Sequence, residues 1–442
     1  MSGAAAFNGS IIGWTEIEAP AAESKARSMA QRVSDRIDGE RLWQRLMELA
    51  RFGATEKGGV CRLALSQEEI EARACLIGWG RSFGLEPATD AAANLFLRLE
   101  GREPGLPPVL LGSHIDSQPT GGKFDGAYGV LAALEAAQAI SALPARPRRS
   151  IEVVAWMNEE GSRFAPGMMG SAVFTGKRRL KDILPIKDRD GCTVEEALQG
   201  VLDAERDLPR RPFGSPVAAF LEAHIEQGIL LQERGVTAGI VTGIQGKRTY
   251  RVEVIGEESH AGTSSRSVRR DALTSAVAIV DALQKAMWDE ADTVRFTIGM
   301  FNVLPNAPSV VPGKVVFSID LRHNELDVIQ RLGDQVPSVC QGARGRCEVK
   351  VTELLYDVPL QFPAAIRSRL GKVAQSLGIT HMELPSPAGH DARYLHYVCP
   401  TGMIFIPCKD GISHNEAESI TPADAAAGAR VLAEAAYQLA NQ

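Results

Sequence analysis

Two short apolar segments constrain this sequence most, because each is followed at once by side chains able to bind a metal. Residues 108–112 lead directly to His114, and residues 151–156 lead to Glu159 and Glu160. Short, almost continuously apolar segments are typical of strands buried on both faces of a sheet. The sequence therefore predicts two buried strands, each ending at a candidate ligand.

Helical patterns separate these strands. Residues 127–142 are rich in Ala and Leu at helical spacing, and the pattern of an amphipathic helix is present at 40–52 and at 67–83. A further strand is predicted at residues 92–97. Strands alternating with helices are typical of an α/β sheet. Such sheets place their chemistry at the carboxyl ends of the strands, which is where His114 lies.

The middle of the chain has a different pattern. It alternates in the order β-α-β-β-α-β, that of a ferredoxin-like module, with strands at 250–254, 294–303, 314–321 and 347–354 and helices at 269–287 and 325–339. We therefore expect an inserted α+β domain at 242–352. The mixed-sheet α/β catalytic domain would comprise 33–241 and 353–442, after a loosely ordered lead-in at 1–32.

Composition excludes several classes of function. A chain of 442 residues is too long to fold around one ordinary hydrophobic core, so we expect two domains. A formal charge of −6 disfavours nucleic acid or an anionic membrane as a partner. No apolar segment reaches the ~20 residues that span a bilayer, and the N-terminus lacks a signal-peptide pattern. Seven scattered cysteines without a CxxC pair are typical of a cytoplasmic protein with reduced thiols.

The first candidate ligands surround a glycine-rich turn. His114 ends a predicted strand, and Asp125 lies in a turn flanked by glycines that let the backbone fold closely around a bound ion. Asp125 is well placed to bridge two ions, and Asp116 could orient the His114 imidazole. Imidazole and carboxylate without thiolate suit two divalent cations, Zn²⁺ first, with Mn²⁺, Co²⁺ and Ni²⁺ as alternatives.

The second group of candidates is spread along the chain. Glu159 and Glu160 are adjacent, so one is able to bind metal while the other faces the attacking water as a general base. His224 and His414 add two imidazoles. Each pattern alone has an ordinary structural explanation, since Glu pairs are usually solvated and single histidines usually pack.

Taken together, the motifs resemble the M20 metallopeptidase-like amidohydrolases, and in particular their hydantoinase/carbamoylase branch. The resemblance extends from about residue 40 to 440. The motifs that carry it are GSHIDSQPTGGKFDGAYG, NEEGSRF, EAHIEQG, HAGT followed by RRDA, PNA followed by VVPG, IDLRH, AGHDA and SHNEAE.

The resemblance implies a role for each ligand. His114 and His224 would hold one metal, Glu160 and His414 the other, and Asp125 would bridge the two. Two further carboxylates would complete the site, with Glu159 as the general acid/base and Asp116 as the residue that orients a ligand.

The resemblance also implies substrate contacts and a homodimer. Arg322 would clamp the substrate carboxylate, a geometry that suits a guanidinium group, although a structural charge at a strand end is the alternative. Gln227, Gly389 and His390 match substrate-side positions. His260 would reach the active site of a partner subunit and stabilise the oxyanion, because the inserted domain dimerises in these relatives.

Two departures from the family pattern concern the substrate. Ser265 and Arg266 replace a Pro and a Met, and Ser309 replaces an Asn that helps to hold the substrate carboxylate. A serine is shorter and offers a single hydroxyl. The metal ligands and the base are unaffected, so the departures bear on the identity of the substrate.

The sequence thus predicts a cytoplasmic, homodimeric amidohydrolase with two divalent metals per subunit. Its substrate would be a small carboxylate-bearing molecule with a non-peptide C–N bond. The preferred candidates are an N-carbamoyl-L-amino acid or a related ureido acid such as allantoate. An N-acyl or conjugate amino acid amidase, or a dipeptidase, remains the alternative for the same metal centre. A non-catalytic binding protein on this scaffold is the third possibility.

Overall fold

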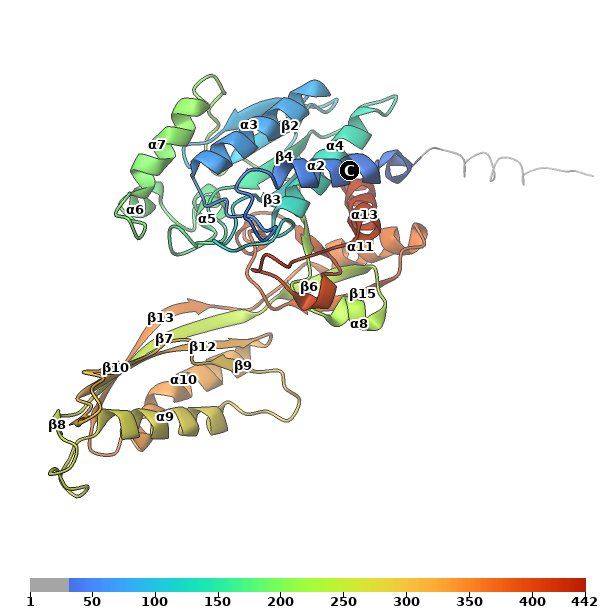
Figure 1. Ribbon diagram of the computed structural model, residues 1–442. Coiled ribbons are helices and arrows are strands. Elements are labelled where there is room, and N and C mark those ends of the chain that lie inside the picture. Colours follow the sequence, from blue (N-terminus) through green and yellow to red (C-terminus); the bar gives the residue numbers. More distant parts are fainter. Residues whose placement is uncertain (1–31) are drawn as a thin grey trace, which may run out of the picture.

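The computed structural model describes residues 32–442 (Figure 1). A nine-stranded mixed sheet forms the centre of the larger part. The strands lie in the order β1-β2-β4-β3-β5-β16-β6-β14, and β15 also pairs with β6. Strands β4, β3, β5 and β16 are parallel neighbours, whereas β1, β2 and β14 pair antiparallel. The bounds are β1 (Glu86–Thr89), β2 (Leu95–Leu99), β3 (Val109–His114), β4 (Ile151–Trp156), β5 (Ala219–Ile225), β6 (Ala238–Ile244), β14 (Leu360–Gln361), β15 (His381–Ser386) and β16 (Thr401–Ile406). The prediction of an α/β fold with a mixed sheet is confirmed.

The two apolar segments form the expected strands. Every residue of β3 and β4 is buried, because helices cover both faces of the parallel part of the sheet. The strand expected at 92–97 begins later, at Leu95. The Asp90 carboxylate accepts the N–H groups of Ala92 and Asn94, and this turn delays the strand.

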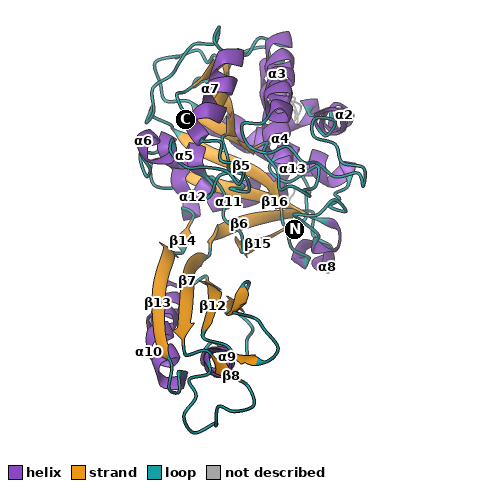
Figure 2. Ribbon diagram, turned by 60° about the vertical axis from the view of Figure 1, so that its left-hand side comes forward, coloured by secondary structure: helices purple, strands orange, loops and turns teal. Residues whose placement is uncertain are grey.

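Helices pack on both faces of the sheet (Figure 2). The helices of this part are α2 (Gly39–Leu49), α3 (Gln67–Ser82), α4 (Ala127–Ser141), α5 (Met169–Phe174), α6 (Leu180–Ile183), α7 (Val194–Ala204), α8 (Leu230–Arg234), α11 (Ala364–Ser376), α12 (Ala392–Leu395) and α13 (Pro422–Ala440), with short 3₁₀ turns η1 (Val33–Arg36) and η2 (Lys409–Gly411). Helices α2, α3 and α4 agree closely with the sequence-based expectations. None of the helices in residues 32–442 combines the length and the apolar character needed to cross a bilayer.

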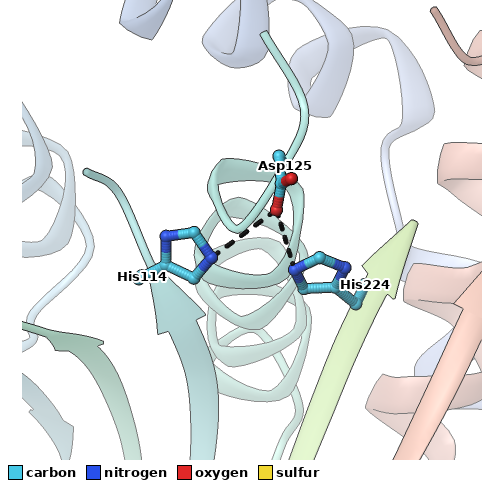
Figure 3. A group of neighbouring side chains, drawn as sticks. All are labelled: His114, Asp125 and His224. Carbon is cyan, nitrogen blue, oxygen red and sulfur yellow. Dashed lines mark ion pairs between the residues drawn. The ribbon is translucent and has the colours of Figure 1, made fainter. Parts of the chain in front are cut away.

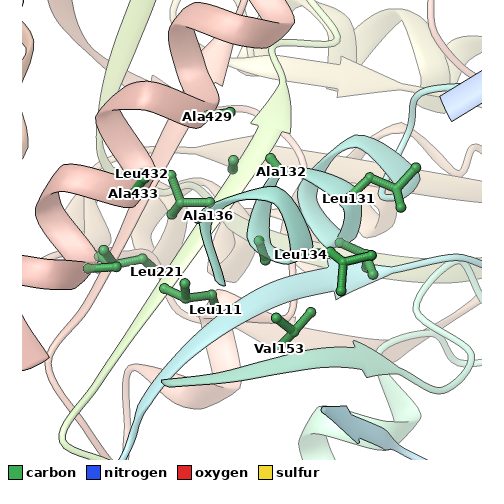
Figure 4. Close-up of a cluster of buried hydrophobic side chains, with 14 of the residues drawn as sticks. Leu111, Leu131, Ala132, Leu134, Ala136, Val153, Leu221, Ala429, Leu432 and Ala433 are labelled. Atoms are coloured by element: carbon green, nitrogen blue, oxygen red, sulfur yellow. The ribbon is translucent and has the colours of Figure 1, made fainter. Parts of the chain in front are cut away.

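The main core lies between the sheet and helices α4 and α13. Leu111, Val153 and Leu221 point from β3, β4 and β5 into this layer, where they join Leu134 and Leu432 (Figure 4). Many core positions on α4 and α13 are alanines, and small side chains let the helices approach closely. The alternate strand residues face a second core on the other side of the sheet. Burial on both faces holds the strand ends firmly in place.

A second sheet is formed by residues between β6 and β14. Its order is β10-β12-β7-β13, β9 also pairs with β12, and all pairs are antiparallel. The bounds of its strands are β7 (Gly246–Ile255), β9 (Arg295–Thr297), β10 (Phe301–Leu304), β12 (Lys314–His323) and β13 (Glu348–Asp357). The same part of the chain contains helices α9 (Ala272–Ala286) and α10 (Leu326–Ala343), and a separate two-stranded ladder of β8 (Ser259–His260) and β11 (Val310–Val311). This sheet and its two helices form a separate lobe below the nine-stranded sheet (Figure 1).

One strand of this lobe differs from the sequence prediction. The single strand expected at 294–303 is two short strands, β9 and β10, that both pair with β12. Between them the N–H of Met300 donates to the Ser318 hydroxyl, so the chain leaves the regular ladder there. The lead-in predicted for 1–32 lies outside the described residues, apart from Arg32.

Candidate metal centre

The candidate ligands meet at the carboxyl ends of the central strands of the nine-stranded sheet. His114 is the last residue of β3, and His224 lies near the end of the neighbouring parallel strand β5. Glu159 and Glu160 follow β4 on the other side of β3. Asp125 lies just before α4 and points between the two imidazoles (Figure 3). The expectation that His114 and the Glu159–Glu160 pair lie at strand ends is therefore confirmed, and the strand that carries His224 was not predicted.

Asp125 forms the first possible ligand group with two buried histidines. Its Oδ1 atom lies 3.1 Å from His224 Nε2 and 3.6 Å from His114 Nε2. His114 Nδ1 lies 3.0 Å from the Asp116 carbonyl, and His224 Nδ1 lies 2.9 Å from the Ile225 carbonyl. Since a carbonyl only accepts, each neutral ring carries its proton on Nδ1 and directs the Nε2 lone pair at the group's centre.

The second possible group shares the same aspartate. Asp125 Oδ2 lies 3.2 Å from His414 Nε2, and Glu160 Oε2 lies 3.3 Å from that nitrogen. Within each group, the ligand atoms lie within 4.8 Å of one another. Because one Asp125 oxygen serves each group, its carboxylate has the orientation required to bridge two ions.

The donor set fits divalent cations. Burial alone would raise the pKa of the Asp125 carboxyl, but the three imidazoles, which donate to it when they are protonated, hold this pKa well below its ordinary range. The hydrogen bond to Asp125 raises the pKa of His414 to about 9. The imidazoles thus converge on a permanent negative charge in a buried site. Nitrogen and carboxylate donors without a thiolate suit Zn²⁺, Mn²⁺, Co²⁺ or Ni²⁺.

Glu159 lies beside the ligands without belonging to either group. Its Oε2 atom is 3.5 Å from His114 Nε2. Burial raises the pKa of Glu159 well above its ordinary value, and the nearby charge of Asp391 adds to this shift although His114 opposes it. A carboxyl group with a raised pKa is able both to take and to return a proton near neutral pH.

Asp116 holds the turn that carries the acidic pair. Its Oδ1 accepts the backbone N–H of Glu159 and its Oδ2 that of Glu160, each at 3.1 Å. The same carboxylate lies 3.5 Å from His114 Nδ1, farther than the carbonyl of Asp116 itself. The Asp116 carboxylate therefore contacts the backbone of Glu159 and Glu160 more closely than it contacts the His114 ring, which the Asp116 carbonyl holds.

Gln227 and His414 are directed at Asp125 by unusual backbone turns. Both have positive φ angles, 57° and 53°, a region that costs free energy for residues other than glycine. The Gln227 amide Nε2 donates to Asp125 Oδ2 at 2.8 Å. Its Oε1 atom is buried without a hydrogen-bond partner among the described residues, so it is available to a ligand.

Sequence reasoning missed the role of Glu418. This buried carboxylate accepts the N–H groups of Phe124 and Asp125, at 2.9 and 3.0 Å, and the Ser413 hydroxyl at 3.1 Å. It therefore fixes the turn of the bridging aspartate from a distant part of the chain. The signal was present, because Glu418 ends the SHNEAE motif, but only His414 was taken from that motif.

A cavity of about 290 Å³ opens onto the ligands. Arg322, Gly389 and His390 line it, as expected from the sequence. Several lining residues were not singled out from the sequence: Gln118, Arg178, Gln245, Lys247, Asp357, Arg393 and Tyr394. These residues come from segments without a recognisable ligand pattern, so tertiary packing alone identifies them.

Arg322 is occupied by protein groups. Its guanidinium donates to both oxygens of Asp320, at 2.8 and 3.2 Å, and to the Pro387 carbonyl at 3.1 Å. His390 is buried and contacts the Ser386 hydroxyl at 2.9 Å through Nε2. Burial, together with the charge of His224, holds the pKa of His390 well below its ordinary value. His390 is thus a neutral ring at the cavity.

His260 and Ser309 lie together, but not at this cavity. His260 pairs with Val310 in the short β8–β11 ladder, and the Ser309 carbonyl accepts the N–H of Ala261 at 3.0 Å. The ladder lies at the end of the second lobe farthest from the nine-stranded sheet (Figures 1 and 2). Both residues are exposed, and within this one chain neither meets the metal ligands.

Comparison with known proteins gives a consistent result. Residues 110–438 match the profile described as peptidase family M20/M25/M40. The chain is 38% identical to the N-carbamoyl-L-amino acid amidohydrolase of Geobacillus stearothermophilus over 92% of this chain and 99% of that protein. It is 33% identical to the allantoate amidohydrolase of Bacillus subtilis over 89% of this chain and 95% of that protein.

Solved structures agree with the sequence relatives. The crystal structure of an amidase of the hydantoinase/carbamoylase family from Burkholderia multivorans superposes with a TM-score of 0.84 and 42% identity, covering 92% of this chain and 99% of that one. The resemblance predicted from the motifs is therefore confirmed, and so is the prediction of a hydrolase. The chain belongs to peptidase family M20/M25/M40, within its hydantoinase/carbamoylase branch of amidohydrolases.

Proposed function

We propose that this chain is a dinuclear metal amidohydrolase that cleaves the ureido C–N bond of N-carbamoyl-L-amino acids or of related ureido acids such as allantoate. The names of its relatives support this class of substrate. The observation that carries the proposal is the position of Asp125, whose two oxygens each face one ligand group. This arrangement is suited to a pair of ions rather than to one.

Five residues would hold the metals. His114 and His224 would bind one ion and Glu160 and His414 the other, with Asp125 shared between them. We propose Zn²⁺ as the native metal, with Mn²⁺, Co²⁺ and Ni²⁺ as alternatives for these donors. When bound, the two ions would lower the pKa of water and polarise the substrate carbonyl.

Glu159 would move the proton. Its carboxylate would take a proton from the attacking water and return it to the leaving nitrogen as the C–N bond breaks. A carbamoyl amino acid and one water would thus give the free amino acid and carbamic acid, which decomposes to CO₂ and ammonia. Asp116 would keep Glu159 in place through the backbone hydrogen bond. Proton transfer by a positioned group contributes typically 10²–10⁴-fold to the rate.

Arg322 would bind the substrate carboxylate. To do so, its guanidinium has to exchange the Asp320 carboxylate for that of the substrate, a like-for-like replacement. Gln227, Gly389 and His390 would complete the contacts, since all of them line the cavity.

The second lobe would serve as an inserted ferredoxin-like dimerisation domain at 242–352. The catalytic domain would comprise 33–241 and 353–442. In a homodimer, the exposed His260 of one subunit would stabilise the oxyanion in the other, and Ser309 beside it would contact the substrate. All seven cysteines are free, which supports a reducing, cytoplasmic location.

The test is a substrate panel with metal control. Ammonia release is measured from N-carbamoyl-L-amino acids and allantoate, and amine release from matched N-acetyl amino acids and dipeptides. Each assay is run with chelated enzyme and again after loading with Zn²⁺ or Mn²⁺. Metal-dependent ammonia release confined to the ureido compounds is expected. Metal-dependent cleavage of acyl or peptide substrates alone would keep the metal chemistry and overturn the substrate.

A further inference from the structure

Arg178 is a cation of the cavity wall that the proposed reaction does not use. It lies between α5 and α6 and lines the same cavity as the metal ligands. One amino group of its guanidinium donates to the Gly167 carbonyl at 2.9 Å, and the other donates to the Tyr394 hydroxyl at 3.3 Å. These two contacts fix the plane of the guanidinium and leave three of its five N–H groups to be satisfied.

The other cations of the cavity are already committed. Lys247 and Arg322 share the carboxylate of Asp320, at 3.2 and 2.8 Å. Arg393 is buried and donates to the carbonyls of Val358 and Gln245, at 2.8 and 2.6 Å. In this structure Lys247 and Arg322 are therefore paired with a protein carboxylate, and Arg393 is held by backbone carbonyls.

Arg178 differs from these cations in its surroundings. Among residues 32–442, no carboxylate oxygen lies within 4.0 Å of the Arg178 guanidinium. This holds also for Asp357, which lines the same cavity. Its side chain is half-buried, so bulk water only partly compensates for the charge. By contrast, the next residue, Arg179, points to solvent and pairs with Asp182 at 2.6 Å. Two guanidinium groups of the cavity thus have no carboxylate partner, and of these Arg393 is buried whereas Arg178 is half-exposed.

We propose that Arg178, supported by Tyr394, binds a second anionic group of the substrate, so that the enzyme takes N-carbamoyl amino acids whose side chain ends in a carboxylate. The inference rests on the proposed function for the reacting end of the substrate. Arg322 would take the α-carboxylate, and Arg178 the side-chain carboxylate of an aspartate or glutamate derivative. A guanidinium with free N–H groups binds a carboxylate through two parallel hydrogen bonds.

The size of the cavity agrees with a ligand of this class. A volume of about 290 Å³ lies at the lower end of the range for small-molecule sites, which suits a ureido dicarboxylic acid. Tyr394 is itself almost buried, and its phenol fixes one Arg178 N–H, so the binding group is pre-oriented. Pre-orientation reduces the entropy that a bound carboxylate would otherwise cost.

The test compares substrates of equal shape and different charge. N-carbamoyl-L-aspartate is assayed against N-carbamoyl-L-asparagine, and N-carbamoyl-L-glutamate against N-carbamoyl-L-glutamine, with wild type, Arg178→Gln and Arg179→Gln. We expect Arg178→Gln to lower the ratio of kcat/KM for acid over amide by about 10- to 100-fold, mainly through KM, because one charge-assisted pair is lost. Arg179→Gln should leave the ratio as in wild type.

A charge reversal separates binding from a structural role. Arg178→Glu should shift the preference towards N-carbamoyl-L-lysine, an outcome that a merely structural arginine would not give. An unchanged acid-to-amide ratio in Arg178→Gln would overturn the proposal. An equal loss for acid and amide would also overturn it, and would assign Arg178 to loop packing or to the α-carboxylate.

The proposed function and this subsite fail in different ways. If wild type hydrolyses none of the ureido acids, the function fails, and the subsite is then judged by calorimetric binding of N-carbamoyl-L-aspartate and its amide. Preferential binding of the acid that is lost in Arg178→Gln would support the subsite. Equal binding of the acid and the amide to wild type would overturn it.

Discussion

The Glu418 carboxylate accepts the backbone N–H of Asp125 at 3.0 Å, across 293 positions of sequence. This hydrogen bond joins the loop before α13 to the turn before α4. The residue that faces both ligand groups therefore depends for its orientation on a carboxylate that binds no metal in the proposed site. Loss of a partner that orients a metal ligand in this way typically costs about 10- to 100-fold in metal affinity or activity.

Replacing Glu418 by Ala should weaken metal binding. The change leaves the N–H groups of Phe124 and Asp125 without an acceptor, so the turn should loosen and the metal affinity should fall by about 10- to 100-fold. Competition with a chromophoric chelator measures this affinity. Glu416→Ala is the matched control, because that side chain accepts from Thr55 instead. Equal affinities for wild type and Glu418→Ala would show that the turn at Asp125 keeps its conformation without the Glu418 carboxylate.

Replacing Glu159 by Gln should separate catalysis from metal binding. The amide is isosteric but cannot take a proton from water, so kcat should fall by about 10²–10⁴-fold. Because Glu159 belongs to neither ligand group, metal analysis of the variant should still give two ions per chain. A near-wild-type rate would assign the base to another residue.

Gly126 should tolerate no side chain. It has a φ of 63°, and a Cβ atom there would lie 2.3 Å from the His114 ring. Gly126→Ala should therefore displace His114 and lower the bound metal below two ions per chain. Gly58→Ala is the control, because Gly58 also has a positive φ, 86°, but open space around it. The control should lose about 1 kcal/mol of stability and keep its metals. Full metal content in Gly126→Ala would contradict the expectation.

Glu69 should make stability depend on pH. Burial raises the pKa of this carboxyl from 4.5 to about 7, against the opposing charge of Arg73. A carboxyl whose folded pKa is raised contributes stability below its unfolded pKa, and that contribution is lost as pH rises through the folded value. With metals chelated, wild type should thus lose about 2–4 kcal/mol relative to Glu69→Gln between pH 4.5 and pH 7.

Denaturant unfolding of both proteins across this pH range checks the prediction. Glu71→Gln serves as the matched control, since Glu71 is exposed on the same helix. Parallel profiles for wild type and Glu69→Gln would show that Glu69 titrates normally in the folded protein.

Much of the fold was accessible from local pattern. Strands β3 and β4 were predicted because burial on both faces demands nearly continuous apolar residues. Helices α2, α3 and α4 followed from their spacing. The break between β9 and β10 was missed, because it depends on a hydrogen bond between Met300 and Ser318, two residues without any distinguishing local pattern.

The sequence by itself determined which side chains stand at strand ends and in glycine turns, and hence which residues had to be considered as ligands. Periodicity and turn chemistry are local properties, so His114 and Asp125 were identifiable without coordinates. Only the tertiary structure decided that the two oxygens of Asp125 face different ligand groups, and that Glu418 fixes its turn. It also placed Arg178 at the cavity without a counter-ion. The physical reason is that buried charges are oriented by partners far away in the chain, and no local pattern records those partners.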